Sequence, residues 1–198
     1  MATSPTVVFQ ALAGGQQPPS AVVDALKQQA GFQRAFFGVK MEDPDTGILA
    51  TEWSNLEAAR SYSASQTAAT LAAKEILGFV AAGEESKDVL AVVSAPCTEI
   101  FTAFGAEEGF VANVGRFVAA VDANQPEGYK GGSFAESVDL SLESTTQQDK
   151  VVRMLIGWTS REAHIEAKAK PGAIQDNIEL LRVLRKSVDL FHVEFKQL

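Results

Sequence analysis

The chain contains 198 residues, of which 46% are hydrophobic and 21% charged, with a formal net charge of −8. This composition is typical of a globular protein with a core, and the acidic balance disfavours nucleic acid and anionic membranes, which both require a basic face. No apolar run approaches the roughly 18 residues of a membrane span, and the single cysteine, Cys97, permits no internal disulfide, so we expect a cytoplasmic protein without nucleic-acid or membrane partners.

The first half of the chain predicts the order strand, helix, strand, strand, helix, strand. Runs of β-branched and aromatic residues favour the strands, and polar stretches rich in Gly, Asp and Pro favour the turns. The spacing of Ser54 and Glu57 matches a capping box, in which side chains satisfy free amide groups at a helix start, so a helix follows Trp53. We expect strands at Thr6–Leu12, Ala35–Met41, Gly47–Trp53 and Val89–Val93, and a first helix opened by Pro18-Pro19-Ser20 with Ser20 as its N-cap.

The second half predicts the same order with a stronger first helix, since apolar residues recur at helical spacing between Phe110 and Val121. Thr159 and Glu162 again match a capping box after a Trp. Pro171-Gly172 interrupts the following helix, because proline lacks the amide hydrogen, and Ile174, Ile178 and Leu181 belong to the buried face of its second piece. The expected strands are Thr98–Phe104, Ser133–Leu140, Val151–Trp158 and Val188–Phe195, with a polar turn at Glu143–Asp149.

Three short segments recur in the same order in both halves, which indicates an internal duplication. Only loop insertions are needed to explain the changing spacing between them. We therefore expect two repeats, residues 1–95 and residues 96–198. The aligned pairs are Thr6–Ala11 with Thr98–Ala103, Gly31–Gln33 with Gly128–Lys130, and Trp53–Ala59 with Trp158–His164.

The later strands are apolar at alternating positions on both faces, as Val151–Ile156 and Val188–Phe195 show. A strand that is buried on both faces needs cover on two sides. Helices can cover one face, and the sheet of the other repeat can cover the second. The pattern therefore predicts a sandwich of two sheets that curls into a barrel.

The element order, the Trp-Ser/Thr-x-x-Glu-Ala step at Trp53 and Trp158, and the closing His192-Val193-Glu194-Phe195 resemble the dimeric α/β-barrel superfamily. Within it they resemble the antibiotic-biosynthesis-monooxygenase (ABM) domain, in the fungal tandem form. The resemblance implies an α+β fold of two ferredoxin-like βαββαβ repeats, whose antiparallel sheets pack face to face as an intramolecular α/β barrel. The chain would then be a monomer by internal duplication or a homodimer.

The chemistry of that superfamily includes cofactor-free oxidation of aromatic polyketides, polyketide cyclisation and haem degradation, so the fold does not fix the function. Haem-degrading members combine an Asn on the first strand, the Trp that ends the third strand, and a His ten residues later. Ten residues after Trp53 and Trp158 stand Ser63 and Lys168, and neither first strand contains Asn. Haem degradation is therefore disfavoured.

Metal and cofactor motifs are absent from the sequence. There is no CxxC, HExxH, glycine-rich phosphate loop or nucleotide fingerprint, and the chain holds two histidines and one cysteine. We therefore expect no cofactor and no dedicated metal site. A site made of a carboxylate and a histidine remains open, because Glu194 and His192 would point to the same face of a strand.

The two histidines, His164 and His192, both lie in the second repeat, where the first has Ala59 and approximately Ala91. A neutral imidazole beside a pocket can act as a general base on a phenol or an activated methylene group. The structural alternative is that His164 lies on the exposed side of a helix start and that His192 satisfies a hydrogen bond between layers.

Four aromatic residues are candidate ligand contacts. Trp53 and Trp158 could stack on an aromatic ligand, although a role as core anchors at the strand–helix junction fits the motif better. Tyr62 and Tyr129 could hydrogen-bond a ligand, although ordinary half-buried tyrosines are commoner.

These residues lead to one functional hypothesis and two alternatives. The hypothesis is an enzyme of the ABM type, a cofactor-free monooxygenase or cyclase, that binds a small apolar or aromatic, polyketide-like metabolite in the second repeat. His192 or His164 would be the catalytic base, and Trp158, Tyr129, Trp53, Tyr62 and Glu194 would contact the substrate. The alternatives are a ligand-binding or stress-related barrel that does not transform its ligand, and an interaction module with an exposed apolar patch.

Overall fold

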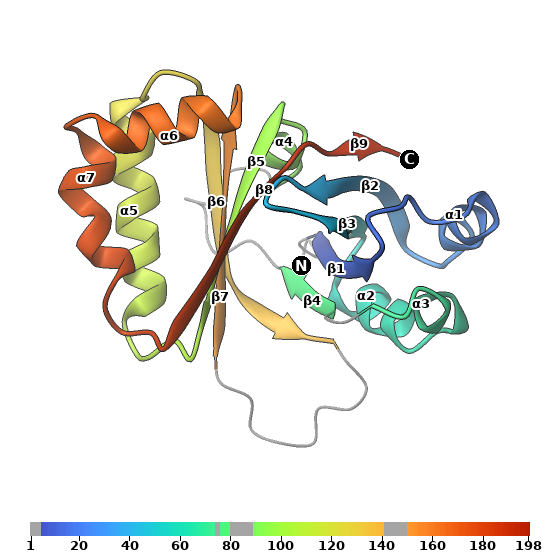
Figure 1. Ribbon diagram of the computed structural model, residues 1–198. Helices are drawn as coiled ribbons and strands as arrows, with labels where there is room; N and C mark the ends of the chain where they lie inside the picture. Colours follow the sequence, from blue (N-terminus) through green and yellow to red (C-terminus); the bar gives the residue numbers. More distant parts are fainter. Residues whose placement is uncertain (1–4, 74–75, 80–88, 141–149) are drawn as a thin grey trace. The chain divides into compact units, whose positions relative to one another are not determined.

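A computed structural model divides the chain into two compact units, each built from antiparallel strands and helices (Figure 1). The structure describes residues 5–73, 76–79, 89–140 and 150–198. Unit 1 comprises the described residues within 1–80, 137–148 and 195–198, and unit 2 comprises those within 81–136 and 149–194. The turn predicted at Glu143–Asp149 lies outside the described residues.

The sheet of unit 1 has the strand order β4, β1, β3, β2. Val8, Leu26, Trp53 and Tyr62 belong to a buried apolar cluster that draws on β1, β3 and the helices α1 and α2. The elements are β1 (Thr6–Ala13), α1 (Ser20–Lys27), β2 (Phe32–Lys40), β3 (Asp43–Trp53), α2 (Leu56–Ser63), α3 (Gln66–Thr70) and β4 (Ile76–Phe79), with β9 (Lys196–Gln197) paired to β2.

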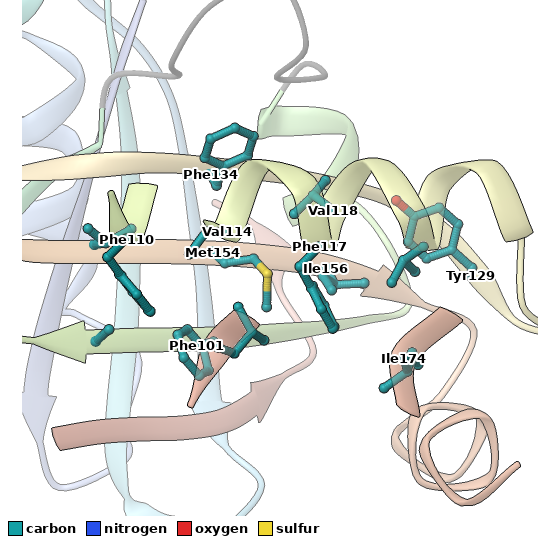
Figure 2. Close-up of a cluster of buried hydrophobic side chains, with 14 of the residues drawn as sticks. Phe101, Phe110, Val114, Phe117, Val118, Tyr129, Phe134, Met154, Ile156 and Ile174 are labelled. Carbon is teal, nitrogen blue, oxygen red and sulfur yellow. The ribbon is translucent and has the colours of Figure 1, made fainter. Parts of the chain in front are cut away.

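The sheet of unit 2 has the strand order β6, β7, β5, β8. The helices α5, α6 and α7 lie together on one face of this sheet (Figure 1). Figure 2 shows the apolar side chains that fill the space between them, with Phe110, Val114 and Phe117 of α5 facing Phe101 and Met154 of the sheet. The elements are α4 (Val89–Val93), β5 (Cys97–Phe104), α5 (Phe110–Asn124), β6 (Tyr129–Asp139), β7 (Val151–Trp158), α6 (Arg161–Ala169), α7 (Ala173–Asn177), the 3₁₀ helix η1 (Ile178–Leu181) and β8 (Ser187–Val193).

Both units therefore place the fourth strand beside the first, the first beside the third and the third beside the second. A βαββαβ chain order with this arrangement is ferredoxin-like, which confirms the predicted α+β class. The face-to-face association of the two sheets and the division into repeats 1–95 and 96–198 stay predictions. None of the helices in the described ranges is long and apolar enough to cross a membrane.

Two predicted elements were wrong. The closing strand of the first repeat is β4, Ile76–Phe79, and the residues predicted as that strand, Val89–Val93, form the helix α4. A run of five apolar residues, four of them buried, is too short for its periodicity to distinguish a strand from a helix. Ser20 is the first residue of α1 rather than its N-cap, which is Pro19.

The capping residues lie one position later than predicted. Asn55, not Ser54, caps α2 by accepting a hydrogen bond from the amide of Ala58 at 2.9 Å. Ser160, not Thr159, caps α6 in the same way. The Trp–helix junction itself is confirmed in both units.

The first strands also align differently from the prediction, which set Thr6 against Thr98. Thr6 pairs with Trp53 on β3, and Cys97 pairs with Trp158 on β7. Thr6 therefore corresponds to Cys97. Because successive side chains of a strand alternate between faces, this shift of one residue exchanges the two faces of the strand.

The predicted break in the second helix is confirmed. α6 ends at Ala169 and α7 begins at Ala173, with Pro171 and Gly172 between them. Gly172 has a φ of +147°, a value that side-chain-bearing residues rarely adopt. The break turns α7 and η1 onto the core, where Ile174 and Leu181 are buried and Ile178 is partly buried against it.

Replacement of Ser160 by alanine tests the observed cap. We expect Ser160→Ala to lower the free energy of unfolding by about 1 kcal/mol, the typical contribution of an N-cap side chain. Thr159→Ala is the matched control and should have a smaller effect, because its side chain is exposed and does not cap α6. Urea unfolding followed by circular dichroism measures both effects. A larger effect of Thr159→Ala would contradict the cap at Ser160 and support the predicted capping box at Thr159.

Candidate functional site

The site begins with Glu99, a carboxylate in the middle of the central strand β5. Every residue of this strand except its last is buried, and Glu99 is only 4% exposed. In the sheet it lies between Ile156 of β7 and His192 of β8. Cross-strand neighbours share a face of the sheet, so the carboxylate and the imidazole of His192 lie side by side.

α6 supplies the third group, His164. The helix is otherwise exposed or half-exposed, and His164 is its one buried residue. Its ring stacks on the indole of Trp158, with ring centroids 5.2 Å apart. The cap at Ser160 fixes where the helix starts, and this start places the ring of His164 over Trp158.

These side chains form one buried polar network. The indole Nε1 of Trp158 donates a hydrogen bond to Oε2 of Glu99 at 2.9 Å. Nε2 of His164 lies 3.6 Å from the same oxygen, and Nδ1 of His164 lies 2.8 Å from Nε2 of His192 in a hydrogen bond. Each polar group therefore meets another one within an otherwise apolar core, as buried polar groups must.

The electrostatics of the network favour a neutral carboxyl group. Burial raises the pKa of Glu99 above its ordinary value, since a charged carboxylate is poorly solvated in the core. The hydrogen bond from Trp158 and the nearby charges of His192 and Lys168 lower the pKa again in part. A carboxyl group with a raised pKa can give or take a proton closer to neutral pH than an exposed one can.

Glu99 and His164 line a small cavity of about 50 Å³ inside unit 2. Four of its apolar wall residues appear in Figure 2, namely Phe101, Phe117, Ile156 and Ile174. The volume is enough for one or two water molecules or for one small group of a larger ligand. The remaining wall consists of Trp158, Lys168, Ile178, Leu181 and Leu190.

Glu99, His164 and His192 are also of the residue types that bind divalent metal ions, and one donor atom from each lies within 4.8 Å of the others. In the structure, however, these atoms face one another. The imidazole nitrogens share a hydrogen bond, and the carboxylate accepts one from Trp158. The arrangement therefore fits a network of paired polar side chains.

The other predicted contact residues lie elsewhere. Trp53 and Tyr62 stack at 4.5 Å in the core of unit 1, and the hydroxyl of Tyr62 donates to Gln10 at 2.6 Å. Tyr129 packs edge-on against Trp158 and is buried in the core of unit 2. Glu194 is exposed, so the carboxylate beside His192 is Glu99 and not Glu194.

Both histidines are buried and are hydrogen-bonded to each other. His164 is buried, so its placement on the exposed side of α6 was wrong. His192 does bridge the sheet and the helix layer through His164, as the structural alternative held. In unit 1 the residue that corresponds to His192 is Gly78 on β4 and not Ala91, since Gly78 pairs with Val8 as His192 pairs with Glu99.

Glu99 was missed by the sequence analysis, although a signal was present. A lone carboxylate interrupts the strand run Cys97–Phe104, where exposed charge is not expected. With the observed register, Glu99 corresponds to Val8 and His164 corresponds to Ala59. Three of the four members of the network in unit 2, namely Glu99, His164 and His192, thus stand where unit 1 has apolar or small residues, and the fourth, Trp158, corresponds to Trp53.

No protein-family model matches the chain, and no curated protein matches it. Solved structures do match over nearly its whole length. An anthrone oxidase-like protein aligns with a TM-score of 0.70 at 10% identity, covering 98% of this chain and 92% of that one. A monooxygenase-like protein from Listeria innocua aligns with a TM-score of 0.52 at 8% identity, covering 96% and 94%.

A third match is a ferredoxin-fold protein from Listeria monocytogenes related to antibiotic biosynthesis monooxygenases. It aligns with a TM-score of 0.53 at 7% identity and covers 96% of this chain and 95% of that one. Identities this low show the fold alone. The fold is thus similar to that of ABM-like proteins, and the function must be argued from the site.

The raised pKa of Glu99 predicts how the stability depends on pH. The fold favours the protonated carboxyl, so this part of the stability is present at low pH and is lost as the pH rises through the folded pKa. In the wild type the free energy of unfolding should fall by about 1.4 kcal/mol for each unit by which folding raises the pKa of Glu99. We expect Glu99→Gln to lack this fall, because glutamine cannot ionise. Thermal unfolding from about pH 5 to pH 8 measures the difference.

The exposed Glu194→Gln is the control, and its stability should follow the wild-type pH profile. His164, His192 and Lys168 are retained in both variants. Parallel profiles for wild type and Glu99→Gln would contradict the prediction.

Proposed function

We propose that unit 2 is the active part of an enzyme that binds a small, largely apolar or aromatic molecule and transforms it by cofactor-independent proton transfer. The observation that carries the proposal is the cavity in which Glu99 and His164 meet, 3.6 Å apart, against apolar walls. An acid and a base that face one cavity suit a substrate with a weakly acidic C–H or O–H group.

The two groups divide the chemistry between them. One removes a proton from a carbon beside a carbonyl, and the other delivers a proton to the carbonyl oxygen, which gives an enol with no change in electron count. Reversal at another carbon gives isomerisation, and attack of the enol on a second carbonyl gives cyclisation. Oxygenation would follow if the enolate met molecular oxygen as the oxidant.

His192 is a positioning residue in this scheme. His192 is not one of the described residues that line the cavity. Its Nε2 is hydrogen-bonded to Nδ1 of His164, which does line the cavity. The bond fixes the orientation and the tautomer of His164, as a third group does for the base of a catalytic triad. Trp158 holds Glu99 in the same way, through the hydrogen bond at 2.9 Å.

Unit 1 supports the fold and lacks these groups. The residues that correspond to Glu99, His164 and His192 are Val8, Ala59 and Gly78, as derived above. The shared strand order of the units supports an internal duplication. We infer that one copy carries the chemistry and that the other retains the scaffold.

Exchange of substrate protons with solvent deuterium tests the proposal, because it detects proton transfer even when the substrate does not react further. Phenylacetone is the first probe, and anthrone is the second, since one structural neighbour is named anthrone oxidase-like. We expect wild-type protein to speed the exchange of the acidic C–H, followed by NMR. His164→Ala and Glu99→Gln should each slow it by about 10²- to 10⁴-fold, the usual contribution of general acid–base catalysis.

His192→Asn separates positioning from packing. We expect kcat to fall with KM nearly unchanged and the pH profile of kcat to shift, which a loss of packing alone would not cause. Tyr62→Phe in unit 1 is the control and should leave exchange at the wild-type rate. Exchange that survives in His164→Ala and Glu99→Gln would contradict the proposal, and a probe that binds but returns unexchanged would favour a non-enzymatic ligand-binding protein.

A further inference from the structure

A second and larger cavity lies on the outside of the same helix layer. This outer cleft has a volume of about 400 Å³, which is within the range of small-molecule sites. It is bordered by the segment after α5, by the start and one face of α6, and by the break between α6 and α7. Its lining includes Glu127, Ala163, Glu166, Pro171 and Ile174.

Among the described residues, Ile174 alone lines both the outer cleft and the 50 Å³ cavity of Glu99 and His164. It is buried, 5% exposed, and stands in the first turn of α7 directly after Pro171-Gly172. Figure 2 shows it on α7, below Tyr129 and beside the sheet. Its side chain is thus a shared wall, with solvent-accessible space on one side and the acid–base pair on the other.

The two volumes limit how a substrate can bind. A cavity of about 50 Å³ cannot enclose an aromatic molecule, since a cavity that holds benzene measures about 150 Å³. The outer cleft can hold a molecule of that size with room to spare. A substrate that reacts at Glu99 therefore needs its body outside and a small reacting group inside.

We propose that the outer cleft and the inner cavity form one ligand site divided by Ile174, in which the cleft holds the body of the ligand and selects an amine or another donor-bearing end. The inner half of the proposal rests on the proposed function. The outer half concerns binding alone and can be tested by itself.

The charges of the cleft decide the class of ligand. In the described part of the chain, its charged lining consists of Glu127, Glu162, Glu166 and one cation, Lys170. Lys170 lies 3.6 Å from Glu127 and offsets part of that charge. The remaining carboxylates favour ammonium or hydroxyl groups over an anion.

Another part of the lining is less polar and would contact a ring or chain. Ala163 and Ala167 of α6, together with Ile174, give it an apolar surface that runs toward the shared wall. A ligand with a donor at one end and an apolar group at the other would satisfy both parts. Benzylamine is the simplest probe of this kind, and benzoate is its anionic counterpart.

Fluorescence quenching by acrylamide tests the shared wall. Trp158 lines the inner cavity and is fully buried, so quenching should be weak in the wild type. We expect Ile174→Ala to raise the quenching constant, because acrylamide can then pass from the cleft to the indole. Ile178→Ala is the matched control, because Ile178 lines the inner cavity and not the cleft.

Trp53 contributes the same background in both variants, since it is fully buried in unit 1. Equal quenching in Ile174→Ala and Ile178→Ala would overturn the shared wall. If Ile174→Ala does not fold, Ile174→Val against Ile178→Val makes the same comparison with a smaller change.

Titration with benzylamine and benzoate, followed by amide NMR, tests the ligand class. We expect benzylamine to shift the amides of Ala163 and Gly172 at lower concentration than benzoate does. Glu166→Gln should weaken benzylamine binding by about two- to fivefold, the range expected for one exposed ion pair, and should not weaken benzoate binding. Equal binding of the two probes, or binding that Glu166→Gln does not alter, would overturn the class.

The outcomes separate the two proposals. Loss of proton exchange in the variants of Glu99 and His164 reports only on the inner pair. Quenching and benzylamine binding report only on the wall and the cleft, because neither requires turnover. A cleft that binds benzylamine in a protein that exchanges no protons would leave this inference standing and remove the enzymatic one.

Discussion

The buried carboxylate of Glu99 is the group around which unit 2 is arranged. An isolated charge in an apolar core is very unfavourable, so such a group must be protonated, hydrogen-bonded or paired. Trp158 supplies the hydrogen bond, and His164 with His192 supplies the adjacent imidazoles. These contacts form only if the strand register, the end of β7 and the start of α6 are each in their exact position. A shift of one residue in any of them would separate the groups.

The break at Pro171-Gly172 links that network to the surface. Because proline ends α6, the chain turns and α7 packs back onto α5 and the sheet. The turn leaves Ile174 between the outer cleft and the inner cavity, since it lines both. The same local feature therefore shapes both compartments, and a continuous helix would provide neither the cleft border nor the shared wall.

Much of this arrangement could be read from the sequence, and the errors share one cause. Periodicity and turn chemistry gave the strand–helix order, the junction after each Trp and the break at Pro171. The wrong predictions were those that must be correct to a single residue. They are the N-caps, which are Asn55 and Ser160, and the alignment of Thr6 between the two units. A local sequence pattern looks much the same when it is shifted by one residue, whereas such a shift in a sheet moves every side chain of the strand to the other face.

The missed carboxylate follows from the same limit. With Thr6 aligned to Thr98, Glu99 corresponds to Val7, and its side chain is assigned to the wrong face. The histidines were identified because their type alone suggests chemistry. Glu99 acquires meaning only from neighbours that are distant in sequence, since Trp158, His164 and His192 reach it through folding. Pairings between distant segments are what a single sequence does not display.

Comparison of the two units separates the demands of the fold from those of the site. Where unit 2 has Glu99, unit 1 has Val8, and where unit 2 has His192, unit 1 has Gly78, whose open space is filled by the side chain of Leu140. The same strand order thus forms with apolar residues at these positions. Replacement of a buried polar cluster by apolar residues is often neutral or stabilising. The network of unit 2 is therefore not required by the scaffold, and under the proposed function its place at the wall of a cavity serves proton transfer.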